Sequence, residues 1–450
     1  TATTGDIDDT GVLTVTGAAI FNTLGTDADI LLDSSNVLGG TISLNTTGSG
    51  GNATINNGAL AIDFATSAVG GNLTATNTAN GMSQSGALDV NGTSTFMATG
   101  GTNNIILSNA ANDFTGAVVT NGANVTLMDA NSIDLGASTI TGNYAVTAIL
   151  GTISDSAALN ISGTSMFTAA GGQDIILDLA STYGGAVTFA PVSGTLNSVT
   201  INSTAGFDFG AALAIGGNLA VTAAGAVTQT GGALTVTGTT SISAAGQVVT
   251  MTQANDFVGA VSVDGLTVQL TDSNSIVLGG STVTNTYTVI ASNGNITQAA
   301  SSPLVISNAA SFTVNGVGTT ITLDDTSNSF GGTVAFAGGA LANVTVVDTT
   351  TIDLAALNLT TLSVTATGIT QTGALVVSGA TTLVSSGAND ITLTNAANNF
   401  GGAVSLTSAQ NATVLDVNAI ELGAASITGN LGVTTTAGNI SQSGILSVTG

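Results

Sequence analysis

Apolar and polar residues alternate along this chain in short runs of period two. The segments LTVTG at 13–17 and 234–238 and LSVTG at 446–450 are clear examples. Because successive side chains of a strand point to opposite faces, leucine and valine point one way in each run and threonine the other. Glycine, asparagine, aspartate and serine separate the runs, as is typical of turns. The pattern predicts an all-β protein of many short strands and no helix.

The alternation also predicts which side chains face the core. The expected buried residues are Leu13, Val15, Leu234, Val236, Leu375 and Val377, and the expected outward residues are Thr14, Thr235 and Val376. Val376 is the most informative position, because a slip of one residue would bury it and expose Val377.

The chain contains an internal repeat of about 72 residues, long enough to hold several coils of a repetitive fold. A segment of the type Gly-Ala-Leu-x-Val-x-Gly places its leucine at Leu13, Leu88, Leu159, Leu234, Leu304, Leu375 and Leu446. A glycine recurs at Gly40, Gly116, Gly185, Gly259, Gly332 and Gly402, usually two residues after an aromatic, at Phe114, Tyr183, Phe257, Phe330 and Phe400, with Leu38 in the first copy. A third segment reads IDF, IDL, FDF, IVL, IDL and IEL, beginning at Ile62, Ile133, Phe207, Ile276, Ile352 and Ile420.

Short strands in a long repeat predict a solenoid, in which each coil buries its apolar side chains against its neighbours. We expect a right-handed parallel β-helix of about eighteen coils, three coils of about 24 residues per repeat. Residues 1–450 are expected to form a single continuous solenoid with six repeats, at approximately 13–87, 88–158, 159–233, 234–303, 304–374 and 375–445. A β-propeller and a series of β-sandwiches are the alternatives, but blades repeat at about 40–50 residues and sandwiches need longer strands.

Composition limits the chemistry of the protein. The chain has no Lys, Arg, His, Cys or Trp, so nucleophilic triads, histidine bases and cysteine or histidine zinc sites are excluded. A glycosidase with two carboxylates is the one enzyme class left. We expect no enzyme, no catalytic, cofactor-binding or metal-binding residue, and no cofactor.

The 25 acidic residues give a net charge of −25 without any compensating cation. Such a surface repels nucleic acid and anionic membranes, so neither is expected as a partner. No apolar run approaches the length of about 20 residues that spans a membrane. The lack of trypsin-type cleavage sites and the abundance of small residues favour an extracellular or cell-surface location.

Two sets of acidic residues recur with the repeat. The first, expected to point outward from the third segment, is Asp63, Asp134, Asp208, Asp353 and Glu421, with Val277 breaking the series. With three coils per repeat its members lie about 14 Å apart along the axis, too far to share an ion, and we interpret them as solubilising charges. The second set, Asp129, Asp272, Asp348 and Asp416, with Asn56 and Asn202 at matching places, follows strands and predicts Asx turns.

Calcium ligation is the alternative for such acids, and the best local cluster is Asp6, Asp8, Asp9, Asp27, Asp29 and Asp33. The calcium-binding nonapeptide of β-rolls is absent, so the sequence does not predict a site there. An ice-binding array would need hydroxyls on every coil of one face. Pairs such as Thr14/Thr16, Thr74/Thr76 and Thr235/Thr237 recur mainly once per three coils, which argues against one. Sequons occur at Asn45, Asn72, Asn91, Asn124 and Asn160 and leave glycosylation undetermined.

Three segments resemble a known family: GNLAVTAAGAVTQTGGALTVTGTT at 217–240, NDITLTNAANNFGGAVSLT at 389–407 and GNISQSGILSVTG at 438–450. They are similar to the repeat region of filamentous-haemagglutinin-like proteins, the large secreted bacterial adhesins exported by two-partner or autotransporter routes. The resemblance implies a right-handed parallel β-helix that forms the shaft of an extracellular fibre. The secretion domain of that family is not recognisable in this sequence.

The leading functional hypothesis is an extracellular structural rod or fibre shaft that acts by shape and self-association. An adhesin module that binds glycans or a cell-surface receptor through a solenoid face is the second, and a carbohydrate-active β-helix enzyme the third. Residues 3–17 and 436–450 match in the repeat, so we also expect these residues to continue into a longer structure or to stack end to end on further copies.

Overall fold

The computed structural model describes residues 1–386 and 389–450. Within them every regular element is a β-strand and every pairing between strands is parallel. The predicted fold class, an all-β parallel β-solenoid, is confirmed. No part of the described chain forms a helix long and apolar enough to cross a membrane.

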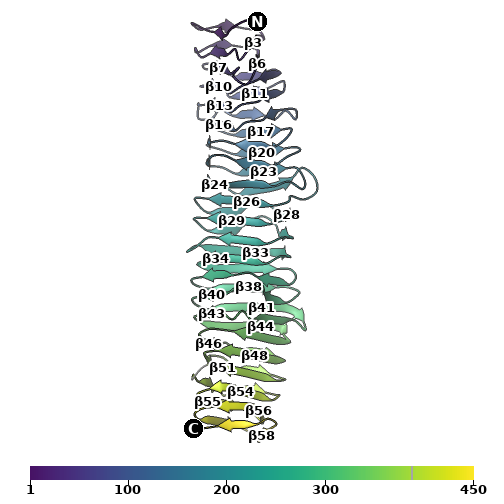
Figure 1. The fold of residues 1–450 in the computed structure, drawn as a ribbon, viewed down its shortest axis with the longest axis vertical. Coiled ribbons are helices and arrows are strands. Elements are labelled where there is room, and N and C mark those ends of the chain that lie inside the picture. The colour runs from purple at the N-terminus through teal and green to yellow at the C-terminus, as the bar shows by residue number, and fades with distance from the viewer. Residues whose placement is uncertain (387–388) are drawn as a thin grey trace. The chain divides into compact units, whose positions relative to one another are not determined.

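The described residues divide into two compact units. Unit 1 is Thr1–Gly225 with Thr230–Gly232, and unit 2 is Ala226–Gln229 with Ala233–Gly450. In each unit the chain passes back and forth between two faces, named 1a and 1b in unit 1 and 2a and 2b in unit 2. Figure 1 shows the strands of each unit stacked turn on turn.

Face 1a contains β1 (Ile7–Asp8), β2 (Thr14–Val15), β4 (Ile30–Leu32), β5 (Val37–Leu38), β7 (Ala53–Asn56), β10 (Leu73–Asn77), β13 (Ser94–Ala98), β16 (Val118–Gly122), β18 (Ile133–Leu135), β19 (Ser138–Ile140), β21 (Ile153–Asp155), β22 (Leu159–Ile161), β24 (Ile175–Tyr183), β26 (Val199–Ser203) and β29 (Leu219–Ala223). Face 1b contains β3 (Ala19–Thr26), β6 (Thr41–Thr47), β8 (Ile62–Phe64), β9 (Ser67–Val69), β11 (Met82–Gln84), β12 (Leu88–Val90), β14 (Ile105–Leu107), β15 (Asp113–Phe114), β17 (Val125–Asp129), β20 (Tyr144–Ala148), β23 (Ser165–Ala169), β25 (Val187–Pro191), β27 (Phe207–Phe209) and β28 (Leu213–Ile215).

Face 2a contains β30 (Val227–Gln229), β31 (Leu234–Val236), β33 (Val248–Phe257), β35 (Thr267–Asp272), β38 (Tyr287–Ala291), β41 (Ala310–Val317), β44 (Thr333–Ala340), β46 (Thr351–Leu354), β47 (Leu357–Leu359), β49 (Gly368–Gln371), β50 (Leu375–Val377), β52 (Ile391–Leu393), β53 (Asn399–Phe400), β55 (Ala412–Asp416) and β57 (Leu431–Thr435). Face 2b contains β32 (Thr240–Ser243), β34 (Val261–Gly265), β36 (Ile276–Leu278), β37 (Ser281–Val283), β39 (Ile296–Gln298), β40 (Leu304–Ile306), β42 (Thr320–Leu323), β43 (Ser329–Phe330), β45 (Asn343–Val347), β48 (Thr361–Ala366), β51 (Thr381–Ser385), β54 (Val404–Ala409), β56 (Ile420–Ile427), β58 (Ile440–Gln442) and β59 (Leu446–Val448).

A typical turn has an uninterrupted strand on one face and two short strands, joined at a corner, on the other. β10, for example, precedes the pair β11 and β12. The split changes faces after about three turns: β14 and β15 lie on face 1b, whereas β18 and β19 lie on face 1a. This flat, two-faced cross-section makes the turn shorter than a three-sided one.

The length of a turn follows from the strand register. Seven successive strand partners lead from Ile62 to Phe209 in unit 1, so each turn takes one-seventh of that stretch of chain. Seven partners likewise lead from Ile276 to Leu422 in unit 2. The structure has about 21 turns. The expected eighteen coils, with three per repeat, were therefore wrong, because each repeat makes three and a half turns.

A half-integral number of turns places equivalent residues of neighbouring repeats on opposite faces. In unit 1, Ile62 lies on face 1b, Ile133 on face 1a and Phe207 again on face 1b. In unit 2, Ile276 and Ile420 lie on face 2b and Ile352 on face 2a. Each face therefore repeats only after two sequence repeats.

The predicted burial register is largely confirmed. Leu234, Val236, Leu375 and Val377 are buried, whereas Val376 points outward and is half-exposed. Thr14 and Thr235 are exposed.

Leu13 and Val15 are half-buried instead of buried. They lie in the first turn, where β2 pairs with β5 alone, so that only one neighbouring turn covers them.

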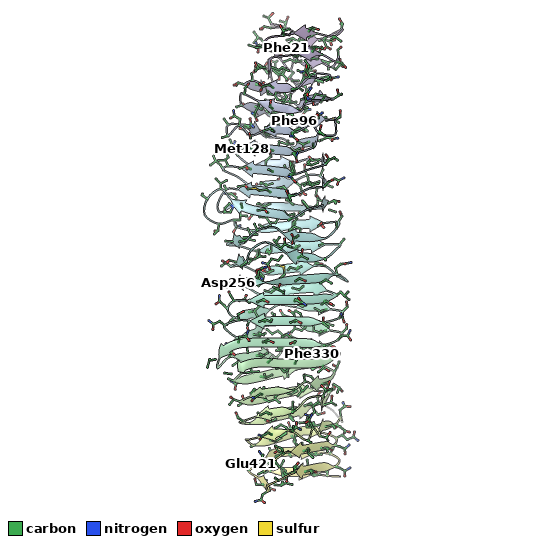
Figure 2. All side chains as sticks on the ribbon, turned by 180° about the vertical axis from the view of Figure 1, so that it is seen from behind. Phe21, Phe96, Met128, Asp256, Phe330 and Glu421 are labelled. Carbon is green, nitrogen blue, oxygen red and sulfur yellow. The ribbon has the colours of Figure 1, made fainter. Side chains whose placement is uncertain are left out.

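Aromatic side chains fill parts of the interior. Phe96 contacts Phe64 and Phe114 edge to face, with ring centroids 6.0 Å apart in both pairs. In unit 2, Phe312 stacks on Phe336 and meets Phe330 edge to face. Figure 2 labels Phe96 and Phe330 among the side chains of the two units, and both are almost fully buried.

Candidate functional site

Buried polar side chains stack at the corners between short strands. Asn112, two residues before Phe114, accepts hydrogen bonds through Oδ1 from the Leu88 backbone N–H (2.9 Å) and from Gln84 Nε2 (2.7 Å). Its Nδ2 donates to Gln84 Oε1 (2.9 Å) in the preceding turn and to the Met128 carbonyl (3.1 Å) in the following turn. One asparagine therefore connects three turns.

The next rung is Asp129, the first aspartate of the set for which we predicted Asx turns. Its Oδ1 accepts from the Asn131 N–H at 2.6 Å, which is the Asx turn, and its Oδ2 accepts from the Phe114 N–H at 2.7 Å. The predicted turn is confirmed, and the contact with the preceding turn was not expected. We name such a stack of Gln, Asn and Asp side chains a corner ladder.

Corner ladders recur in each unit. Unit 2 contains three of the same composition: Gln229–Asn255–Asp272, Gln298–Asn328–Asp348 and Gln371–Asn398–Asp416. Unit 1 contains two variants. One is Asp9–Asn36–Asn57. In the other, Ser181 accepts from the Leu159 N–H and Asp155 accepts from the Asp178 N–H.

The sequence contains a signal for these ladders that our predictions did not include. A polar residue, asparagine in most repeats, stands two positions before the recurring aromatic, as at Asn112, Asn255, Asn328 and Asn398. Its regular place beside a buried ring indicates a structural partner for the backbone, because buried polar groups must be hydrogen-bonded.

Burial changes the acidity of several ladder carboxyls. It raises the pKa of Asp129 to about 6, against the opposing effect of the Phe114 and Asn131 N–H donors. Burial likewise raises the pKa of Asp155 to about 6 and raises the pKa of Asp272 and Asp348. The chain has no Lys, Arg or His that could offset this desolvation.

The outward acids of the third segment do not come together. Asp63 and Asp208 lie on face 1b, about seven turns apart, and Asp134 lies on face 1a. Asp353 lies on face 2a, whereas Val277 and Glu421 lie on face 2b. We expected neighbouring members of this set about 14 Å apart on one side, at three strand spacings. That arrangement was wrong, because three and a half turns separate neighbours within a unit and place them on opposite faces.

The aspartates near the start of the chain bind backbone groups of the next turn. Asp6 Oδ1 accepts from the Asp29 N–H (2.8 Å), Asp29 Oδ1 from the Asn52 N–H (2.8 Å) and Asp27 Oδ1 from the Gly50 N–H (2.8 Å). No group of three or more His, Cys, Asp or Glu side chains in residues 1–386 and 389–450 is arranged to hold a metal ion.

Some sequon asparagines have the same structural use. Asn72 Oδ1 accepts from the Thr93 N–H (2.8 Å) and Asn124 Oδ1 from the Asn143 N–H (2.9 Å), each one turn further on. An asparagine before an inward apolar residue and an outward threonine reproduces the sequon, so the fold itself accounts for these motifs.

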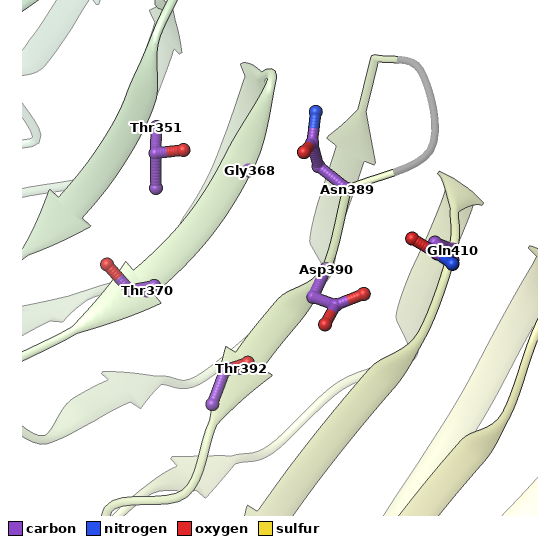
Figure 3. A pocket seen from close by; sticks show the side chains of 7 residues that line it. All are labelled: Thr351, Gly368, Thr370, Asn389, Asp390, Thr392 and Gln410. Atoms are coloured by element: carbon purple, nitrogen blue, oxygen red, sulfur yellow. The ribbon is translucent and has the colours of Figure 1, made fainter.

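A polar hollow of about 290 Å³ lies on face 2a of unit 2. It is lined by Thr351, Gly368, Thr370, Asn389, Asp390, Thr392 and Gln410, and Figure 3 shows these side chains around the bare backbone of Gly368. Asp390 Oδ1 accepts from the Asn411 N–H (3.0 Å) and Nδ2 (2.9 Å). Because Asp390 is the one carboxylate among the lining residues, the hollow lacks the carboxylate pair of a glycosidase.

Hydroxyl side chains follow one another turn by turn on face 2b. The hydroxyl row, as we call it, has one residue on each of six successive turns: Thr297, Thr322, Thr345, Ser363, Thr382 and Ser405. We had considered Thr-x-Thr pairs, which recur mainly once per three coils, and did not expect a row of single hydroxyl residues on every turn of this face. The serines and threonines of the row come from different positions of the sequence repeat, so the repeat itself does not predict the row.

Parallel pairing in flat turns, buried corner ladders and a long internal sequence repeat define the class of this protein, a repetitive parallel β-solenoid. The chain belongs to the family described as repeats of unknown function (DUF5649). That family's model matches residues 1–45, 50–121, 122–190, 196–264, 265–337, 341–407 and 409–450. Comparisons with curated proteins and with solved structures found no match.

Proposed function

We propose that this chain is the shaft of an extracellular or cell-surface fibre, which acts by shape and self-association and not by catalysis. The observation that carries the proposal is the continuity of the turn-to-turn bonding. Strand pairing, corner ladders such as Gln84–Asn112–Asp129, and outer contacts such as that of Asn72 with Thr93 connect successive turns within each unit. Such nearest-neighbour bonding supports a stiff, extended particle.

The resemblance of segments 217–240, 389–407 and 438–450 to filamentous-haemagglutinin-like repeats supports the same proposal. We propose that the chain shares with those proteins its export and its place in a bacterial surface fibre. The absence of Lys, Arg, His and Cys from the sequence supports the non-enzymatic part of the proposal.

An in-register deletion tests the shaft. Ile62 and Phe209 occupy equivalent positions seven turns apart, so removal of residues 62–208 joins the chain without changing its faces. Electron microscopy should find elongated particles that this deletion shortens by roughly 34 Å, at about 4.8 Å per turn. Round particles, or a length that the deletion does not change, would contradict the proposal.

The polar hollow favours a second function, glycan binding by an adhesin module. Its hydroxyl, amide and carboxylate groups are of the kind that hydrogen-bond to sugars. The test is a glycan array probed with the protein and with a Thr392→Ala/Gln410→Ala variant, with Thr126→Ala on face 1b as the control. Loss of a bound glycan in the hollow variant alone supports the adhesin function, and equal binding by all three proteins contradicts it.

A further inference from the structure

Part of face 2b carries no charge, in a chain that carries 25 acidic residues. The outward residues of β45, β48, β51 and β54 are hydroxyl side chains, valines and one asparagine. They are Asn343, Thr345, Val347, Thr361, Ser363, Thr365, Thr382, Val384, Ser405, Thr407 and Ser408. The four strands pair without a register shift, so these side chains form a flat, regular surface.

Four of the six residues of the hydroxyl row, Thr345, Ser363, Thr382 and Ser405, run through the middle of this surface. In the described part of the chain, none of its six hydroxyl groups has a hydrogen bond to another residue, and all six side chains are half-exposed or exposed. The six hydroxyl groups can therefore donate and accept hydrogen bonds with water or with a ligand that covers the face.

The spacing of the polar groups is set by the backbone. Neighbours in the hydroxyl row are separated by the strand spacing of about 4.8 Å, and residues two apart in one strand, such as Ser363 and Thr365, by about 6.6 Å. The result is a two-dimensional lattice of hydroxyl and methyl groups. The strand spacing is close to the shorter repeat of the oxygen atoms in a prism plane of hexagonal ice, and the within-strand spacing is somewhat shorter than the longer repeat.

The surface lacks the groups that favour charged ligands or stacked sugar rings. It has no charge for an ion or a phosphate and no aromatic side chain on which a sugar ring could stack. Because the backbone sets the spacing of the hydroxyls along the row, the array can order water at a smaller entropic cost than a flexible surface could. We propose that the surface around the hydroxyl row binds ice, with Thr345, Ser363 and Thr382 at its centre.

Other faces have shorter rows. On face 1a, Thr54, Thr74 and Thr95 follow one another, but Val119 comes next and Met97 interrupts the neighbouring column. On face 2a, a row of Thr370, Thr392 and Thr413 begins beside Asp353 and ends at Gly432. This second row supplies a matched control.

Ice affinity tests the proposal directly. The protein is frozen slowly in a growing ice hemisphere, and its fraction in the ice is compared with that of a Thr345→Tyr/Thr382→Tyr variant. The tyrosines stand two turns apart on the hydroxyl row and would hold the ice lattice away from the face. We expect the unaltered protein to enter the ice and the variant to be excluded from it, with unchanged circular dichroism.

The control is Thr370→Tyr/Thr413→Tyr, which places the same two rings two turns apart on face 2a. It should enter ice as well as the unaltered protein does, and both should slow ice recrystallisation. Exclusion of the unaltered protein from ice overturns the proposal. Equal loss of ice incorporation in both variants also overturns it, because the effect would then not belong to the hydroxyl row.

Discussion

Single buried polar residues hold neighbouring turns together in this protein. Asp129 and Asn112 each replace the water that backbone N–H groups at a corner would otherwise need. The arrangement satisfies the backbone but places a carboxyl group in a region without any cationic side chain. Because the same carboxyl group both satisfies the backbone and is desolvated, its protonation and its replacement should each change stability.

The first prediction at the scale of the residue concerns pH. The pKa of Asp129 and of Asp155 rises from 3.8 in the unfolded chain to about 6 in the folded protein. The folded state therefore binds more protons than the unfolded state between pH 4 and 6, and the free energy of unfolding falls as pH rises through that window. Thermal melts should give a higher midpoint at pH 4 than at pH 7.

An Asp129→Asn/Asp272→Asn variant should show a weaker dependence of the midpoint on pH. The control is Asp134→Asn, which alters a half-exposed carboxylate on face 1a. A melting temperature that rises from pH 4 to pH 7 would show that the buried carboxyls do not control stability.

The second prediction at this scale concerns the substitution Asn112→Leu in the corner ladder. The substitution removes the Asn112 partner of the Leu88 N–H and of the Met128 carbonyl. It also removes the Asn112 partner of the half-buried Gln84 amide, which keeps its hydrogen bond to the Gly86 carbonyl. At about 1–3 kcal/mol for each unsatisfied group, we expect a loss of roughly 3–5 kcal/mol in local stability. Urea unfolding measures it. Asn121→Ala, on the outer side of β16, should change the midpoint little, and equal effects of the two substitutions would refute the role of the ladder.

At the scale of the strand, alternation predicts the inner and outer sides of each element but not the length of the turn. The burial of Leu375 and Val377 and the exposure of Val376 followed from the pattern of the sequence. The number of strands per turn did not, because nothing in residues 118–122 indicates that β16 stays whole while β18 and β19, its partners, are split. The length of a turn determines which residues of successive turns lie side by side. The hydroxyl row could therefore be identified only from the strand pairing in the structure.

The close packing of successive turns at the corners can be tested by replacing a corner glycine with alanine. A Cβ added to Gly116 would lie 2.5 Å from the Gly92 carbonyl oxygen, which is backbone and cannot rotate away. Gly116→Ala should therefore displace two turns at a cost of roughly 1–3 kcal/mol, measured by urea unfolding. Gly101→Ala, whose Cβ would meet nothing within 4 Å, is the matched control. Unchanged stability of the first variant would mean that the corner is loosely packed.

At the scale of the whole molecule, charge repulsion acts without compensation. Added salt screens it, since the screening length falls from about 10 Å at 0.1 M to about 3 Å at 1 M. We expect the melting temperature to rise with sodium chloride and to remain constant on addition of a calcium chelator or a reductant. A large fall with chelator would establish a structural calcium ion, and a fall with salt would indicate that repulsion is unimportant.

The half turn left over by each repeat has a genetic consequence. Gain or loss of one copy within a unit rotates everything beyond the event by half a revolution, so that residues in the place of Asp63 exchange sides with those in the place of Asp134. Gain or loss of two copies restores the original orientation, because two half turns make one full revolution. Unequal recombination between copies is thus neutral for the two surfaces only in even steps. Lineages in which one surface has a use should differ in length by pairs of repeats.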